Sequence, residues 1–363
     1  MTSSEKDKPE CSCLRGPQPV FPLPYPPVVP AQGPVTVRVL VCYQRSVFKA
    51  HDYDHGSMWL TARAFERQTN RVLQNSLVAH RIEVVHVMML EDDREKVSNT
   101  FAWELKDNSV VKSARRNHQA DAVICAVLSG ESLGYALAPP GRISVDTFES
   151  AYVVVDHDCL SGLTWTHEMG HVFGLGNVGD VMSVLPEVGE ARGWTLEPFR
   201  KYCTVMTHRN GVVKRTRIPN FSNPDVIWPD SGEPTGVEGE ANAAKVLGWT
   251  MPIVATYHTQ LGKPKHLVTM ENSVRLSMNV FPNSETGRVW ITRSPDMWED
   301  DGAMRYERGT KIHVEACATG GWKLAGWQVD GQRVKSDGNR LTVPISRDRG
   351  IPLNITAVMA QVF

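Results

Sequence analysis

The chain has few cysteines, little net charge and no long hydrophobic run. Seven cysteines among 363 residues are too few and too scattered for a disulfide scaffold. The formal net charge is -1, so no basic surplus indicates nucleic acid or an anionic membrane surface as a partner. No stretch approaches the roughly 18 apolar residues that a membrane helix needs. We therefore expect a globular protein without a membrane span, whose partners are recognised by a specific binding or active site and not by overall charge.

The N-terminus, MTSSEKDKPECSCLRG, lacks the basic start and apolar run of a secretory signal. This indicates either a mature or trimmed form, or export by a route without a classical signal peptide. We expect the protein to act outside the producing cell, with the cytoplasm as the alternative.

The composition divides the chain into four parts. Residues 1–34 are rich in proline and predict a disordered, extended leader. An α/β domain is expected over 35–251, followed by a linker over 252–271. Residues 272–363 contain short alternating strands separated by turn residues, which predicts a small all-β domain.

The α/β domain begins with an apolar, β-branched run that is typical of a strand buried on both faces. Four such runs predict strands: 36–44, 81–90, 121–128 and 151–158. Between the first two, Met58, Ala62, Phe65 and Val72 recur at helical spacing. Strands that alternate with helices predict right-handed crossovers and a largely parallel sheet. Cys42 and Cys125 lie inside these strands, so we interpret them as buried thiols.

A two-histidine motif follows the last of these strands. On a helix, His167 and His171 lie one turn apart on one face, while Trp165 and Met169 lie on the opposite face. The histidines can therefore bind one zinc ion while the apolar face packs on the sheet. Glu168 can reach a water on that ion without binding the metal, and is the expected general base for hydrolysis.

The five-residue pattern can also arise by chance on a surface helix. The glycines at 170 and 174 argue against that alternative, because each weakens an ordinary helix by roughly 1 kcal/mol and therefore needs a structural reason.

The run HEMGHVFGLGN (167–177) resembles the metzincin signature HExxHxxGxxH/D, in which the glycine lets the helix end and the chain turn back with a third ligand. YCTVMTHR (202–209) resembles the Met-turn of that family, with Met206 beneath the metal. The resemblance covers about residues 36–250 and is nearest to bacterial reprolysin-like peptidases. It implies an α/β (α+β) catalytic domain with a mostly parallel twisted sheet and an active-site helix, and a zinc metalloendopeptidase that cleaves protein or peptide substrates as a monomer.

One position departs from the signature: the third ligand position holds Asn177 in place of His or Asp. Three interpretations stay open: Asn177 binds through its carbonyl oxygen, Asp180 replaces it, or the site holds metal weakly. His208 follows Met206 by two residues, where some metzincins carry a tyrosine that contacts the metal or the oxyanion. We expect His208 to take a catalytic role, with a solvated surface histidine as the alternative.

Two further features bear on substrate and partner. Lys214, Arg215 and Arg217 follow the Met-turn; we interpret them as a solvated loop, with preference for an acidic substrate side chain as the alternative. The C-terminal part resembles small β modules of bacterial secreted proteins, in which Trp322 and Trp327 are expected in the core, with a carbohydrate or partner platform as the alternative. A binding protein on a degraded peptidase scaffold is the alternative to the enzyme.

Overall fold

A computed structural model describes residues 33–91, 97–129, 134–137, 143–177, 190–196, 201–207 and 215–362. The chain forms two compact units. The described residues of the first unit fall within Met1–Gln44, Ala62–Val85 and Asp92–Lys265, and those of the second within Arg45–Thr61, His86–Glu91 and His266–Phe363. His208 and Asp180, and the leader up to residue 32, lie outside the described residues.

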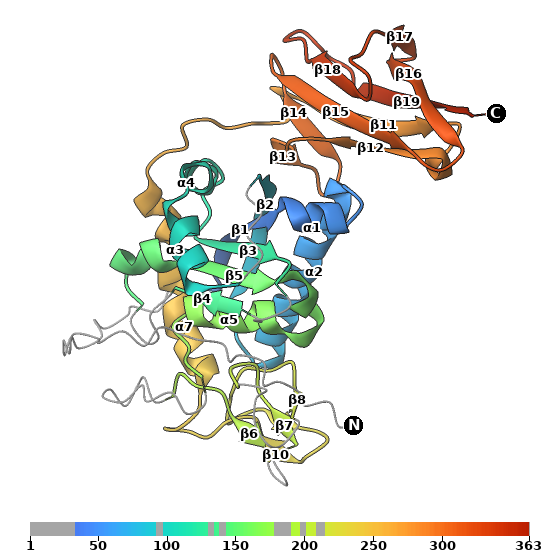
Figure 1. Cartoon of the computed structure of the whole chain (residues 1–363). Helices are drawn as coiled ribbons and strands as arrows, with labels where there is room; N and C mark the ends of the chain where they lie inside the picture. Colours follow the sequence, from blue (N-terminus) through green and yellow to red (C-terminus); the bar gives the residue numbers. More distant parts are fainter. Residues whose placement is uncertain are drawn as a thin grey trace, which may run out of the picture. The chain divides into compact units, whose positions relative to one another are not determined.

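The first unit is built on a five-stranded sheet with the order β2-β1-β3-β5-β4 (Figure 1). The strands are β1 (Thr36–Gln44), β2 (Arg81–Leu90), β3 (Ala122–Val127), β4 (Gly134–Ala136) and β5 (Tyr152–Asp156). β1 pairs with β3 and β3 with β5 in parallel, while β4 runs antiparallel at the edge. The four predicted strands are confirmed to within a few residues at their ends, and the mixed α/β class is confirmed.

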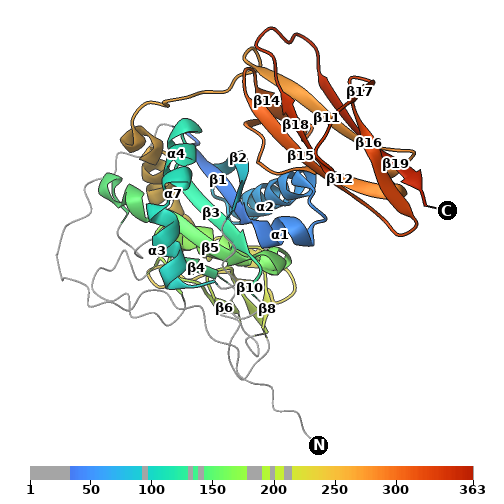
Figure 2. The ribbon, with the colours of Figure 1, turned by 45° about the horizontal axis from the view of Figure 1, so that its top comes forward.

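Helices cover both faces of this sheet, which explains the continuous apolar sequences of its central strand β3 and of β5. Every residue of β3 and β5 is buried, and Cys42 and Cys125 stand opposite each other in fully buried register. Burial raises the pKa of the Cys42 thiol. In Figures 1 and 2, α3 and α7 lie on one side of the sheet and α2 on the other. The described helices of this unit are α2 (His55–Asn75), α3 (Asn99–Asp107), α4 (Ser109–Asn117), α5 (Thr164–Val172) and α7 (Ala243–Val254).

Short elements complete the first unit. They are η1 (Val145–Ser150), η2 (His157–Gly162), β6 (Thr195–Leu196), β7 (Tyr202–Cys203), β8 (Thr216–Arg217), β9 (Ile227–Trp228), β10 (Glu233–Pro234) and η3 (Tyr257–Leu261). The end of α7 and the whole of η3 fall within the region expected to be a linker, and the two units divide between Lys265 and His266.

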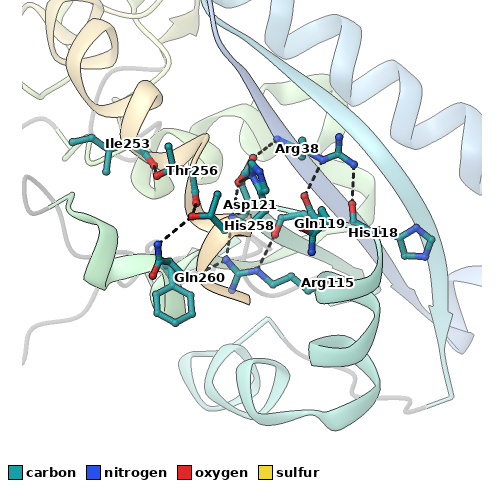
Figure 3. Close-up of polar contacts among 12 residues, drawn as sticks. Arg38, Arg115, His118, Gln119, Asp121, Ile253, Thr256, His258 and Gln260 are labelled. Atoms are coloured by element: carbon teal, nitrogen blue, oxygen red, sulfur yellow. Dashed lines mark hydrogen bonds and ion pairs between the residues drawn. The ribbon is translucent and has the colours of Figure 1, made fainter. Parts of the chain in front are cut away.

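A buried carboxylate ties η3 to the amino ends of β1 and β3 (Figure 3). Asp121 is fully buried and accepts hydrogen bonds from the backbone N–H of Arg38 (2.8 Å) and of His258 (2.9 Å). The Nδ1 of His258 lies 2.8 Å from the same carboxylate. Arg115, also buried, donates to the carbonyls of Asp121 and Phe148. These contacts fix the amino ends of the strands, so we assign the cluster a structural role.

The second unit contains two β-sheets that enclose one core. A six-stranded sheet has the order β13-β14-β11-β19-β16-β17, and a three-stranded sheet has the order β12-β15-β18. Trp327 is fully buried in the core between them, and Trp322 is partly buried against it, which confirms their predicted place. The all-β character expected for the C-terminal part is thereby confirmed.

The strands of this unit are β11 (Ser273–Phe281), β12 (Gly287–Ile291), β13 (Met297–Trp298), β14 (Met304–Glu307), β15 (Lys311–Ala318), β16 (Trp322–Val329), β17 (Gln332–Val334), β18 (Arg340–Pro344) and β19 (Leu353–Gln361). The unit also contains α1 (Arg45–Ala50), η4 (Ser284–Thr286), the start of α2 and the end of β2. No helix among the described residues is long and apolar enough to cross a membrane.

Candidate metal centre

The predicted two-histidine motif lies on α5, and all nine residues of that helix are buried. Trp165 packs against Phe65 of α2 and donates its indole N–H to the carbonyl of Asp156 (3.0 Å). The hydroxyls of Thr69 and Thr166 are 2.9 Å apart, which joins the same two helices. Trp165, on the face predicted to pack on the sheet, therefore contacts α2 as well as the end of β5. The motif helix is an interior element, which contradicts the alternative of a chance pattern on a surface helix.

Backbone carbonyl groups orient both histidine rings. The Nδ1 of His167 is 2.6 Å from the carbonyl oxygen of Val205, and the Nδ1 of His171 is 2.7 Å from that of Leu175. A carbonyl oxygen only accepts, so Nδ1 must carry the hydrogen in each ring. In the neutral imidazole, Nε2 is then the basic nitrogen. The ring centroids are 4.9 Å apart with an angle of 88° between the planes. This is the hydrogen-bonding pattern that metal-binding histidines adopt.

Gly174 ends the helix as the sequence predicts. Its φ of +86° lies in the left-handed region, which glycine enters without strain. The N–H of Leu175 then donates to the carbonyl of Gly170 (2.9 Å), and the N–H of Gly176 to that of Ala191 (2.6 Å). The reversed chain carries Asn177, which is 1% exposed. A side chain at the third ligand position is thus held in the interior by the turn.

Gly170 has a different structural reason. A Cβ at this position would collide with the sulfur of Met206 and would come within 3.3 Å of the Phe221 ring. Met206 is fully buried directly against the helix. Both glycines therefore have the structural reasons that the sequence required, one for close packing and one for the turn.

Glu168 is fully buried beside the antiparallel edge strand β4. A Cβ on Gly134 would lie 2.5 Å from Oε1 and 2.6 Å from Cδ of Glu168. Only glycine leaves room for the carboxyl group here. Sequence reasoning missed Gly134, although a glycine in a strand often marks the close approach of another group.

Arg217 differs from both of its predicted roles. Its guanidinium donates to the carbonyl of Gly162 (3.1 Å), just before α5, and to that of Thr207 (2.9 Å), just after Met206. It therefore connects the two ends of the candidate centre, so neither a solvated loop nor a substrate contact describes it. Arg215 is half-buried, and Lys214 lies outside the described residues.

The described residues bring together His167, Glu168, His171 and Asn177 on α5 and the turn after it. Two ring nitrogens of fixed tautomer fit a zinc ion, and the amide oxygen of Asn177 is the weaker donor at the third position. Among the described residues, no group of three or more His, Cys, Asp or Glu side chains forms a metal site. His208 and Asp180, the other predicted contributors, fall outside this part of the chain.

No family model matches the chain, and no curated protein matches it. The chain is similar to a solved structure described as "Structure of a chaperone-substrate complex", with a TM-score of 0.50 and 17% sequence identity. The match covers 62% of this chain and 35% of that one, so the chain spans about a third of its length. At this identity the likeness concerns the fold alone.

Proposed function

We propose that the protein is a zinc-dependent endopeptidase of the metzincin type, which hydrolyses peptide bonds in protein or peptide substrates. The observation that supports this best is the pair of hydrogen bonds from His167 and His171 to backbone carbonyls. Two histidines with a purely structural role would not need to lie on one turn of a buried helix. Nor would they need Nδ1 of both rings to be hydrogen-bonded to main-chain carbonyls.

In this proposal, His167 and His171 would hold a zinc ion through Nε2, and Asn177 would complete the set through its side-chain oxygen. A bound zinc ion polarises a carbonyl group and lowers the pKa of a coordinated water toward about 7. The carbonyls of Val205 and Leu175 keep the rings in the required tautomer and make the nitrogens more basic.

Glu168 acts as the general base and then as the general acid. Its carboxylate takes a proton from the attacking water and passes it to the leaving amine. Gly134 leaves the space that holds the carboxyl group beside β4, and burial of Glu168 excludes competing solvent protons. Met206, packed under Gly170, supports the floor of the centre.

The test compares the full-length protein with Glu168→Ala for zinc content and for cleavage of casein and of peptides. We expect both proteins to retain zinc and the variant to lose 10²–10⁴-fold in rate, which is the usual contribution of a general base. Glu233→Ala, an exposed carboxylate in β10, is the matched control and should retain full activity.

Equal cleavage by wild type and Glu168→Ala would refute the mechanism. Absence of zinc from both would favour the binding protein on a peptidase scaffold. The zinc affinities of Asn177→Ala, Asp180→Ala and His208→Ala then identify the third ligand, and we expect Asn177→Ala to have the largest effect because Asn177 is buried next to the turn.

A further inference from the structure

The second unit contains a cavity of about 750 Å³ that is separate from the histidine centre. All of its lining residues belong to this unit. The volume is within the range of small-molecule binding sites. None of the residues of the proposed peptidase site lines it, so a ligand of this cavity is a separate question from the proposed function.

The floor of the cavity is the outer face of the three-stranded sheet. Two rows of side chains cross it: Trp290, Glu315 and Arg340 stand opposite one another, and His313 stands opposite Thr342. The inward residues between them, such as Val314, belong to the core. Alternation along the strands therefore presents a polar face with one large aromatic ring.

The polar groups of this face hold one another in place. Arg340 Nε is 2.8 Å from a carboxylate oxygen of Glu315. His313 Nδ1 is 2.9 Å from the hydroxyl of Thr342. Each of these side chains still has further donor or acceptor capacity, because a guanidinium has five N–H groups and a carboxylate accepts several hydrogen bonds. The face is thus a fixed array of alternating donors and acceptors.

Two aromatic side chains from outside the sheet, Tyr53 and Phe48, also line the cavity. Tyr53 stacks on Trp290 with ring centroids 4.5 Å apart and 20° between the planes. Phe48 also lines the cavity, and it stacks on His55, whose Nε2 is 3.2 Å from the carbonyl of Ile291. These two side chains are therefore anchored to β12, so the aromatic surfaces are preformed.

Charge balance narrows the class of ligand. The lining contains three basic residues (Arg45, Lys335 and Arg340) and three acidic ones (Glu91, Glu315 and Asp337). An anionic or cationic ligand would meet as many unfavourable charges as favourable ones. An apolar ligand would remove six charged side chains from water without compensation. A neutral ligand with many groups that both donate and accept fits this lining.

Peptides and carbohydrates both meet that description, but the strand pairing of the sheet distinguishes between these two classes of ligand. A peptide that adds to a sheet needs an unpaired strand edge. Here β15, the central strand of the cavity floor, is hydrogen-bonded on one side to β12 and on the other to β18, so it has no unpaired edge and presents side chains to the cavity. Hydroxyl groups both donate and accept at one atom, and the carbon faces of a sugar ring match an aromatic surface. We propose that this cavity binds a neutral oligosaccharide.

The experiment titrates the full-length protein with four neutral tetrasaccharides: β-1,4-linked glucose, β-1,4-linked N-acetylglucosamine, α-1,4-linked glucose and mannose. Calorimetry gives the affinity, and the part of the tryptophan fluorescence change that Trp290→Ala removes reports on Trp290, one of ten tryptophans. We expect saturable binding of at least one saccharide, with affinity reduced at least tenfold in Trp290→Ala and in His313→Ala. Trp103→Ala, a 42% exposed tryptophan of α3, is the matched control and should bind like wild type.

His313 is an exposed position, so its replacement keeps the fold even where Trp290→Ala does not. Failure of all four saccharides to bind would overturn the proposal, as would wild-type affinity in both variants. A casein-derived peptide is titrated in parallel into Glu168→Ala, so that no cleavage interferes. Peptide binding that His313→Ala abolishes, without saccharide binding, would assign the cavity to peptides instead.

Discussion

Gly134→Ala is the most informative single change because it moves the proposed general base without altering it. The added Cβ would lie 2.5 Å from Oε1 and 2.6 Å from Cδ of Glu168, whereas ordinary van der Waals contact begins near 3.4 Å. The carboxyl group must therefore retreat by about 1 Å. Glu168 is fully buried, so neighbouring side chains resist that movement.

The expected cost follows from geometry. Displacing a reacting group by about 1 Å can reduce the rate 10²-fold, while removing a general base costs 10²–10⁴-fold. We expect kcat/KM for a peptide substrate to fall about 10²-fold in Gly134→Ala, and zinc content to stay at the wild-type level because His167 and His171 are untouched. The residual activity should exceed that of Glu168→Ala.

Gly248→Ala is the matched control. Gly248 lies inside α7, and a Cβ there would meet no heavy atom within 4 Å, so this variant should keep full activity and gain about 0.5–1 kcal/mol in stability. Activity and zinc content are measured on the same samples, with circular dichroism as the folding check. Wild-type kcat/KM in a folded, zinc-loaded Gly134→Ala protein would refute the assignment of Glu168 as the base.

Three further changes test other parts of the structure. Gly170→Ala should displace Met206 and lower zinc affinity at least tenfold, measured by competition with a chromogenic chelator; unchanged affinity would contradict the role of this packing. Burial lowers the pKa of His55 from 6.5 to about 4, so the unfolded chain binds the proton more tightly. The contribution of neutral His55 to the free energy of unfolding is therefore complete above pH 6.5, and about 3 kcal/mol of it is lost as the pH falls to 4. The urea midpoints of wild type and His55→Gln should converge over that range. Asp121→Asn should cost about 1–3 kcal/mol in urea unfolding, because one of the two oxygens that face Arg38 and His258 becomes an NH2 group that cannot accept their hydrogen bonds, with peptidase activity unchanged; a loss of activity would contradict its structural role.

Strand and helix patterns predict the fold well where most residues of an element are buried. The runs at 36–44 and 81–90 match β1 and β2 at both ends, because buried apolar side chains make up most of each strand. The contacts of α1 belong to the second unit, whereas the sequence groups its residues with the α/β domain. Such contacts depend on side chains from distant parts of the chain, such as Tyr53 on Trp290. Local periodicity contains no information about them.

At the candidate centre, the sequence likewise identifies the side chains but not the contacts that orient them. His167, Glu168 and His171 are identified from their spacing, because one helix turn sets their relation. The carbonyls that fix the histidine rings belong to Val205 and Leu175, and main-chain atoms leave no sequence signal. The sequence alone indicates a charged loop at Arg217, because the distance in sequence between Arg217 and Gly162 hides the contact between them.

The main-chain contacts of the two histidine rings also affect what is needed at the third ligand position, where Asn177 is a weak donor. The rings of His167 and His171 are oriented by the turn at Leu175 and by the segment at Val205, so any metal-binding geometry is set before a third donor is added. A centre whose first two ligands are already ordered loses less conformational entropy on binding than a flexible one. An amide oxygen from Asn177, itself buried, can then suffice where a mobile amide would not. The departure at Asn177 is therefore compatible with an active enzyme, provided that Gly174 keeps the turn in place.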